Sequence, residues 1–254
     1  MATRPDDPDT PPPGRLPDFV VIGAMKCGTS SLRHYLALHP KVFVAEQSPD
    51  FFLEEHNWPR GVAWYRARFV DGARVCGEVS PRYTNAPFFA GVPERMHAVL
   101  PDAKLLYVVR DPVERLVSHW MHARAYGRED RPFAEALRDL EGNVYVGRSR
   151  YALQLAPFLA RYPRARLLVL YQEDLWSRRG PAMRRVFAFL GVDPAFTSAG
   201  FGDLKHRSAD LRRAGSPIAR PTVPEALRRT LRALFREDMA YVAELAGGPC
   251  PAWR

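Results

Sequence analysis

The sequence predicts an α/β fold with a central parallel sheet and helices on both faces. Short apolar runs of strand length alternate along the chain with longer segments of helical periodicity, which is the order that parallel sheets with crossover helices produce. The first apolar run also ends in a glycine-rich loop directly before a helical segment, as in phosphate-binding folds. With 254 residues, of which 46% are hydrophobic, the chain can build the core of such a domain.

The expected strands are rich in valine and leucine, as strands buried on both faces of a parallel sheet are. They cover residues 19–22, 42–44, 74–76, 105–109 and 167–170. In folds of this kind, ligands bind at the carboxyl ends of the strands. That edge of the sheet is therefore the expected place for a binding site.

Helical periodicity fills most of the chain between these strands. In one segment Val113, Leu116, Val117 and Trp120 form a single apolar face. Residues 197–222 are basic and irregular, and this length suits either a segment that folds over a ligand or a surface loop. The expected helices are 29–38, 60–69, 87–100, 112–126, 151–161, 182–190 and 224–245.

Composition sets the domain organisation. Residues 1–17 hold six prolines, three aspartates and little apolar content, which predicts a disordered leader, and residues 18–254 are expected to form a single domain. No segment has the length of a membrane-spanning helix, and the first residues lack the apolar core of a signal peptide. The three cysteines match neither a zinc motif nor a disulfide framework. We therefore expect a cytoplasmic chain without a membrane partner.

The net charge of +9 and the pI of about 9.8 favour anionic ligands. The basic residues are spread along the chain and form no run interleaved with aromatic residues, so we do not expect nucleic acid as a partner. His119 and His122 lie one helical turn apart, and we expect them to be packing or surface residues. No metal site is predicted, and the pattern specifies no oligomeric state.

The stretch 20–31 reads Val-Val-Ile-Gly-Ala-Met-Lys-Cys-Gly-Thr-Ser-Ser, a strand followed by a tight loop and a helix start. Backbone N–H groups of such a loop converge on an anion, and Lys26 adds a full positive charge. The spacing of Gly23 and Gly28 fits a phosphate-binding loop, but a Walker A loop would carry its lysine directly after the second glycine. The alternative is an ordinary strand-to-helix turn with a surface lysine. The candidate phosphate ligands are Lys26, Cys27 (through its amide), Gly28, Thr29, Ser30 and Ser31.

A second group of charged residues follows the strand at 105–109. Pro112 suits the first turn of the next helix and Asp111 can cap it, which leaves Arg110 to present its guanidinium to a phosphate. Ser118 would point from that helix toward the same group. The alternative is a local ion pair between Arg110 and Asp111. Two cationic sites at strand ends of one sheet favour a ligand with phosphates at both ends.

Together these motifs resemble those of the sulfotransferases that use 3′-phosphoadenosine 5′-phosphosulfate (PAPS), most of all the heparan sulfate glucosaminyl sulfotransferases. The resemblance runs from about residue 18 to residue 190. Its motifs are Lys26-Cys27-Gly28-Thr29-Ser30, Leu38-His39-Pro40 with Val42, Phe51-Phe52, Trp64-Tyr65, Glu78-Val79-Ser80-Pro81-x-Tyr83, and Val109-Arg110-Asp111-Pro112-x-Glu114-Arg115 with Ser118.

The resemblance implies a P-loop-like architecture of the sulfotransferase/NTPase type. It implies an enzyme that transfers a sulfuryl group from PAPS, its co-substrate, to a hydroxyl or amine of a carbohydrate or small metabolite without a metal. It places the 5′-phosphosulfate on Lys26 and the loop amides and the 3′-phosphate on Arg110 and Ser118. Tyr151 would lie near the cofactor or acceptor, and the basic segment with Lys205 and Arg207 would close over the 3′-phosphate.

The sequence departs from that family at its acid–base positions. Ser48 stands where the heparan sulfate enzymes carry a glutamate base, Asp50 where they carry a histidine, and Val79 where they carry a second lysine. If residues 46–50 are extended, Glu46 and Asp50 share one face with Ser48, because side chains alternate along a strand.

We therefore predict Glu46 or Asp50 as the general base, with Glu78 in reserve. The alternative is that Asp50 caps a turn and Glu46 pairs with an arginine.

Two other functions stay open at this point. A P-loop-type kinase would need magnesium and a serine or threonine directly after a loop lysine, which this loop lacks. A module that binds PAPS, or its product adenosine 3′,5′-bisphosphate (PAP), without catalysis would explain the missing glutamate and lysine.

Overall fold

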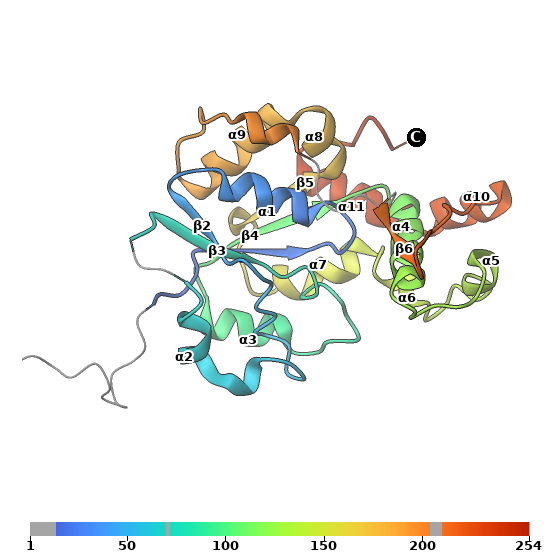
Figure 1. Cartoon of the computed structure of the whole chain (residues 1–254), viewed down its shortest axis with the longest axis horizontal. Helices are drawn as coiled ribbons and strands as arrows, with labels where there is room; N and C mark the ends of the chain where they lie inside the picture. Colours follow the sequence, from blue (N-terminus) through green and yellow to red (C-terminus); the bar gives the residue numbers. More distant parts are fainter. Residues whose placement is uncertain (1–13, 70–71, 204–209, 254) are drawn as a thin grey trace, which may run out of the picture.

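The fold is built on a parallel sheet of five strands, as the computed structural model in Figure 1 shows. The structure describes residues 14–69, 72–203 and 210–253. The strand order β2-β3-β1-β4-β5 confirms the predicted parallel sheet, although β3 lies a little later than expected. The strands are β1 (Phe19–Gly23), β2 (Val42–Val44), β3 (Val75–Val79), β4 (Lys104–Val109) and β5 (Leu167–Tyr171).

Helices cover both faces of the sheet, which confirms the predicted layers. Above the sheet in Figure 1 lie α1 (Thr29–Ala37), α8 (Gln172–Ser177) and α9 (Arg179–Leu190). Below it lie α2 (Gly61–Arg66), which a short 3-10 turn at Trp58–Arg60 precedes, α3 (Val92–Val99) and α7 (Tyr151–Leu159). Helix α11 (Arg236–Ala246) packs against α7 and β5.

A smaller helical cluster with its own apolar core extends to one side of the sheet (Figure 1). It consists of α4 (Pro112–Ala125), α5 (Phe133–Ala136), α6 (Val144–Gly147) and α10 (Glu225–Leu234). Its core includes Val117 and Trp120 from α4, and Leu231 from α10. Because α4 starts at the end of β4, this cluster stands directly beside the carboxyl edge of the sheet.

Several elements differ from the sequence expectation. The expected helix 87–100 begins only at Val92, because Gln154 holds both the N–H and the carbonyl of Ala86 (2.8 and 2.9 Å) in a turn before it. The expected helix 224–245 is two helices that meet at Phe235. The segment 197–222 contains a small hairpin, β6 (Arg212–Arg213) with β7 (Ser216–Pro217), that packs on α4.

The expected leader lies at the edge of the described structure. Residues 1–13 lie outside the described residues. Arg15 donates a hydrogen bond to the carbonyl of Ala73 (2.9 Å) and pairs with Asp18 (2.5 Å), while Leu16 packs against the main core. Within the described ranges, no helix combines the length and the apolar character that crossing a bilayer requires.

Candidate active site

The loop between β1 and α1 leads into the N-terminus of α1 through two residues with positive φ. Gly28 has a φ of +90°, a left-handed conformation that favours glycine. A Cβ at this position would lie 3.0 Å from the side-chain nitrogen Nε2 of Gln172. Lys26 also has a positive φ of +72°, which is uncommon for a residue other than glycine. Gly28 caps α1 without a side chain, and the first turn of α1 contains no acidic residue. The positive end of the helix dipole therefore faces the loop.

Lys26 lies among other cations. Burial lowers the pKa of its ammonium to about 8, with the positive charges of Arg110 and Arg115 acting in the same direction. Lys26 and Arg110 follow β1 and β4, which pair in parallel, so both residues lie at the carboxyl ends of neighbouring strands. The structure therefore brings the two predicted cationic groups together at one edge of the sheet.

Arg110 is fixed at the end of β4 by its backbone. Its N–H donates to the hydroxyl of Tyr151 (3.3 Å), and that hydroxyl donates to the carbonyl of Arg110 (2.7 Å). Its guanidinium lies over the ring of Trp176 and 3.6 Å from a carboxyl oxygen of Glu114, one helical turn away. Asp111 instead caps α4 by accepting hydrogen bonds from the first-turn N–H groups (2.9 and 3.1 Å), as predicted.

Arg115 is a buried cation that the sequence interpretation assigned no function. Its side chain is fully buried and donates to the hydroxyl of Ser149 and the carbonyl of Tyr145, both at 2.6 Å. Its Nη1 is buried, and no hydrogen-bond partner for it is found in the described part of the chain. A buried donor without a partner is costly, so this atom marks a place where an anion is favoured.

Among the other predicted nucleotide ligands, the backbone N–H of Cys27 donates to the carbonyl of Ala24 (3.2 Å), so the predicted role of this amide as a phosphate donor is not supported. Cys27 lies 3.6 Å from the hydroxyl of Tyr151, and burial raises the pKa of its thiol to about 11. Ser118 is buried in α4, while Thr29 and Ser31 are buried in the first turn of α1. Lys205 and Arg207, which we expected over the 3′-phosphate, lie outside the described residues.

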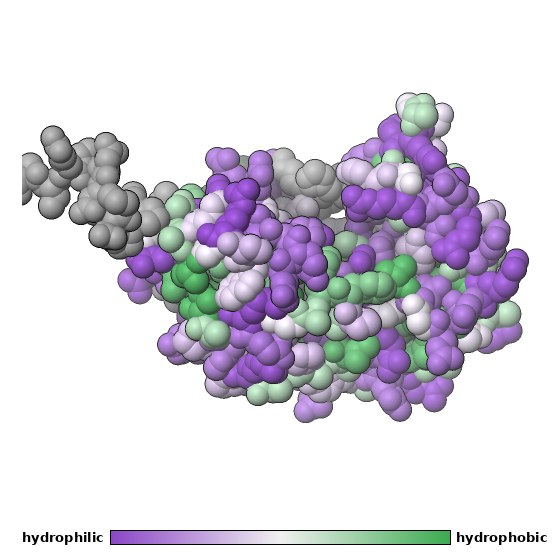
Figure 2. Space-filling view, turned by 90° about the horizontal axis from the view of Figure 1, so that it is seen from below, coloured by the Kyte–Doolittle hydropathy of each residue, from purple (hydrophilic) through white to green (hydrophobic). Residues whose placement is uncertain are grey.

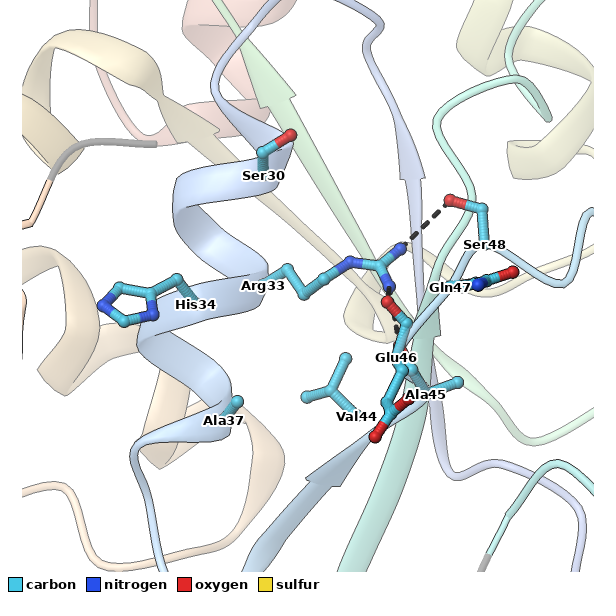
Figure 3. Close-up of a pocket in the computed structure, with 9 residues that line it drawn as sticks. All are labelled: Ser30, Arg33, His34, Ala37, Val44, Ala45, Glu46, Gln47 and Ser48. Carbon is cyan, nitrogen blue, oxygen red and sulfur yellow. Dashed lines mark hydrogen bonds between the residues drawn. The ribbon is translucent and has the colours of Figure 1, made fainter. Parts of the chain in front are cut away.

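Two cavities adjoin the loop, and Ser30 lines both of them. The first, of about 520 Å³, has Lys26 and His122 in its wall. Burial, followed by the charge of Lys26, lowers the pKa of His122 to about 4. The second cavity, of about 620 Å³, lies between α1 and residues 44–48 (Figure 3).

Arg33 builds the wall of the second cavity, as Figure 3 shows. From α1 its guanidinium donates to the carbonyls of Ala45 (2.6 Å), Glu46 (2.5 Å) and Val79 (2.7 Å), and to the hydroxyl of Ser48 (3.0 Å). These four bonds tie the segment after β2 to the end of β3. The sequence interpretation gave Arg33 no function, because its contacts join three segments that are distant along the chain.

Glu46 and Asp50 do not share the face that an extended segment would give them. The chain bends at Glu46, and Asp50 has a φ of +46°, so the expected strand-like alternation is wrong. The carboxyl of Glu46 is exposed at the second cavity and points away from Ser30 in Figure 3. Its contact with an arginine is through its backbone carbonyl.

Asp50 and Glu78 form a linked pair of carboxyls at the end of β3. Burial raises the pKa of Asp50, although its ion pair with Arg82 (3.2 Å) acts in the opposite direction. Glu78 is fully buried, and burial raises its pKa to about 8. The hydroxyl of Ser80 joins the two, since it accepts from the N–H of Asp50 and donates to Glu78, both at 3.3 Å.

A wall beside the phosphate loop is formed around Arg148. Its guanidinium bonds to the side-chain oxygen of Asn85 and lies 3.1 Å from the Nε2 of His119. It also lies 3.9 Å from the sulfur of Met25, the residue before Lys26. Burial lowers the pKa of Arg148 to about 10 and keeps His119 neutral, since its pKa falls well below the ordinary value. This wall is therefore basic, with one neutral imidazole.

Comparisons with known proteins agree with this geometry. The sequence model of the family described as the sulfotransferase domain matches residues 16–208. Human heparan sulfate glucosamine 3-O-sulfotransferase 6 is 33% identical over 261 residues, which cover 92% of this chain and 74% of that protein. Bovine bifunctional heparan sulfate N-deacetylase/N-sulfotransferase 2 is 30% identical over 279 residues, and the chain spans only 31% of its length.

Solved structures give the same result at the level of the fold. A sulfotransferase from Alicyclobacillus acidocaldarius is similar with a TM-score of 0.76 and 29% identity, covering 94% of this chain and 99% of that one. Mouse sulfotransferase SULT7A1, solved in complex with PAP, shares the fold with a TM-score of 0.54, at 14% identity and over 93% of this chain and 90% of that one. Sequence and structure thus confirm the predicted P-loop-like fold, and the chain belongs to the sulfotransferase domain family of enzymes.

Proposed function

We propose that the chain transfers a sulfuryl group from PAPS to a hydroxyl or amine of an acceptor. The observation that carries this proposal is the placement of Lys26 and Arg110 directly after the paired strands β1 and β4, with the buried Arg115 in the first turns of α4 and the N-terminus of α1 behind the loop. These groups suit a nucleotide with phosphates at two positions. The buried Nη1 of Arg115 provides a further donor for that ligand.

The residues divide between the two ends of the nucleotide. Lys26 and the amides of residues 28–31 bind the 5′-phosphosulfate, and Arg110 with Ser118 binds the 3′-phosphate. Tyr151 contributes indirectly, because its hydroxyl fixes the backbone of Arg110. PAPS supplies the sulfuryl group and carries the leaving phosphate. Lys26 stabilises the charge that develops on the leaving oxygen, an effect that is strongest in the transition state.

Asp50 is the general base in this proposal. Its raised pKa and its buried position suit a carboxylate that takes a proton from the acceptor as the new S–O bond forms. Glu78 accepts a hydrogen bond from Ser80, which in turn holds the N–H of Asp50, so Glu78 acts by positioning Asp50. Glu46 lines the second cavity, but its carboxyl is exposed and points away from Ser30, so we assign it second place as the base.

The acceptor is proposed to carry a sugar or a similar polyhydroxylated group. The names of the relatives support this proposal, because both name heparan sulfate. We further propose that residues 18–254 act as a single domain after the leader 1–17, and that the enzyme works in the cytoplasm.

Thermal unfolding with added nucleotides tests the function. PAP should raise the melting temperature strongly, because a ligand that binds only the folded state stabilises it in proportion to log concentration. ATP with magnesium should have little effect, and stabilisation by ATP–magnesium alone would favour a kinase. Binding of PAP without transfer from PAPS to any member of an acceptor panel would favour a module that has lost catalysis.

A further inference from the structure

An apolar groove lies beside the candidate site, between the turn after β3 and helices α6, α7 and α10. Its volume of about 440 Å³ lies in the range of pockets that hold small molecules. Polar and charged residues, among them Asn143, Arg150 and Thr230, also line it. Its large apolar lining residues are Phe88, Leu140, Val146, Leu153 and Leu234. We call this cavity the apolar groove.

Exposed apolar side chains are concentrated in this groove. Phe88, Leu153 and Leu234 are 51%, 49% and 36% exposed, and they are half of the large exposed hydrophobic residues in the described part of the chain. Figure 2, which views the molecule from below, shows that apolar residues reach the surface in several places among hydrophilic ones. Exposed apolar side chains that line one groove often mark a binding site.

One side chain, Arg148, contacts both the groove and the phosphate loop. The guanidinium of Arg148 lies over the ring of Phe88, 5.5 Å from its centroid. The same guanidinium lies 3.9 Å from the sulfur of Met25, which directly precedes Lys26. The turn that carries Phe88 is fixed, because Gln154 holds both backbone groups of Ala86. Arg148 is thus the side chain that lies between the groove and the phosphate loop.

We propose that the apolar groove binds the alkyl chain of an amphiphilic acceptor whose hydroxyl or amine lies at Lys26. This inference rests on the proposed function and specifies its acceptor class. The polar head of such a molecule would lie beside Arg148 and the carboxyl pair, and its chain would cover Phe88 and Leu153. A second copy of the chain fits less well, because a stable interface buries about 800 Å² on each partner, far more than a groove of this size offers.

Chain length gives a quantitative readout of this proposal. Each buried methylene group should strengthen binding about fourfold, until the groove is filled. The probes are methyl, butyl, hexyl and octyl β-D-glucoside, used below their micelle-forming concentrations. Isothermal titration calorimetry would measure their dissociation constants on the protein saturated with PAP, and again without PAP.

Two variants locate the binding. Leu153→Glu places a charge in the groove at a half-exposed position, so the fold should survive. Val62→Glu is the matched control, because Val62 is 37% exposed on α2 and does not line the groove. We expect the dissociation constant to fall about sixteenfold from butyl to hexyl glucoside in the wild type and in Val62→Glu. In Leu153→Glu it should not depend on chain length.

The contrary outcomes are distinct. The proposal would be overturned if the dissociation constants of the wild type did not depend on chain length. It would also be overturned if those of Leu153→Glu did. A wild-type dimer that Leu153→Glu separates, together with no binding of the glucosides, would assign the groove to a second copy instead. Failure of PAP to bind would refute the proposed function, while the titrations without PAP would still decide whether the groove takes alkyl chains.

Discussion

The buried carboxyl of Glu78 should make the stability of the protein depend on pH in a characteristic direction. Burial raises its pKa from the ordinary 4.5 to about 8. A carboxyl with a raised pKa binds a proton more tightly in the folded state than in the unfolded state. Its contribution to stability is therefore complete below pH 4.5 and is lost as the pH rises through about 8. Because one pKa unit corresponds to about 1.36 kcal/mol, this single group should contribute a decline of about 5 kcal/mol.

Glu78→Gln removes the titrating group and keeps a side chain that can accept the hydrogen bond from Ser80. Urea unfolding between pH 5 and 8.5 would give the free energy of unfolding of both proteins. The difference between wild type and variant should change with pH by about 1.4 kcal/mol per unit. Other titrating groups, including His119, cancel in that difference. Glu46→Gln is the matched control, since this carboxyl is exposed, and its curve should run parallel to that of the wild type.

A pH dependence that is identical in wild type and Glu78→Gln would refute the reasoning. It would mean that Glu78 is ionised in the folded protein at neutral pH, with a compensating donor in its surroundings. The pair with Asp50 would then be electrostatically different from the one that the geometry describes.

Further predictions concern the nucleotide and acceptor sites. Lys26→Ala should lower the rate of transfer by about 10²–10³-fold. In the wild type, PAP binding should weaken above pH 8, where Lys26 loses its proton, and this weakening should be absent in Lys26→Ala. Asp50→Asn should lower the rate by about 10²–10⁴-fold with unchanged PAP affinity, whereas Glu46→Gln should stay close to wild type, and the reverse result would make Glu46 the base. Arg33→Lys should lose most of the four hydrogen bonds and cost about 2 kcal/mol in urea unfolding; an unchanged midpoint would contradict this. Cys27 should resist iodoacetamide at pH 8 in the native protein, because it is buried and its pKa is about 11, and rapid labelling would show that the loop opens.

The parts of the fold that the sequence predicted are those that local pattern determines. The strands were found because strands buried on both faces are continuous apolar runs, and the start of α4 because Asp111 and Pro112 are a cap and a first-turn residue. The division of the last helical segment at Phe235 was not found, because the apolar spacing continues across it while the two halves pack on different cores. Helices α5, α6 and α8 are only four to six residues long, too short for a periodic signal.

The candidate site divides in the same way. Lys26 and Arg110 could be placed together because parallel strands deliver their carboxyl ends to one edge. The contacts of Arg33 and Arg148 join segments tens of residues apart, and no spacing rule encodes them. The expected alternation of Glu46 and Asp50 failed for a local reason, since the chain bends after β2 and Asp50 takes a left-handed conformation.

In the protein without its nucleotide, the cations at the sheet edge raise the free energy of the folded state. This cost indicates that the site is built for an anionic ligand. Arg110 and Arg115 both lower the pKa of Lys26, so the positive charge of Lys26 is less favourable because of theirs. Packing alone gives no reason to bury Arg115 with a donor that lacks a partner among the described residues. A ligand with two phosphates would add attractions that outweigh this repulsion, and binding should then raise the pKa of Lys26 and take up a proton near pH 8. Calorimetric titration of PAP in two buffers of different ionisation enthalpy would detect that proton, and binding without proton uptake would place the phosphates away from Lys26.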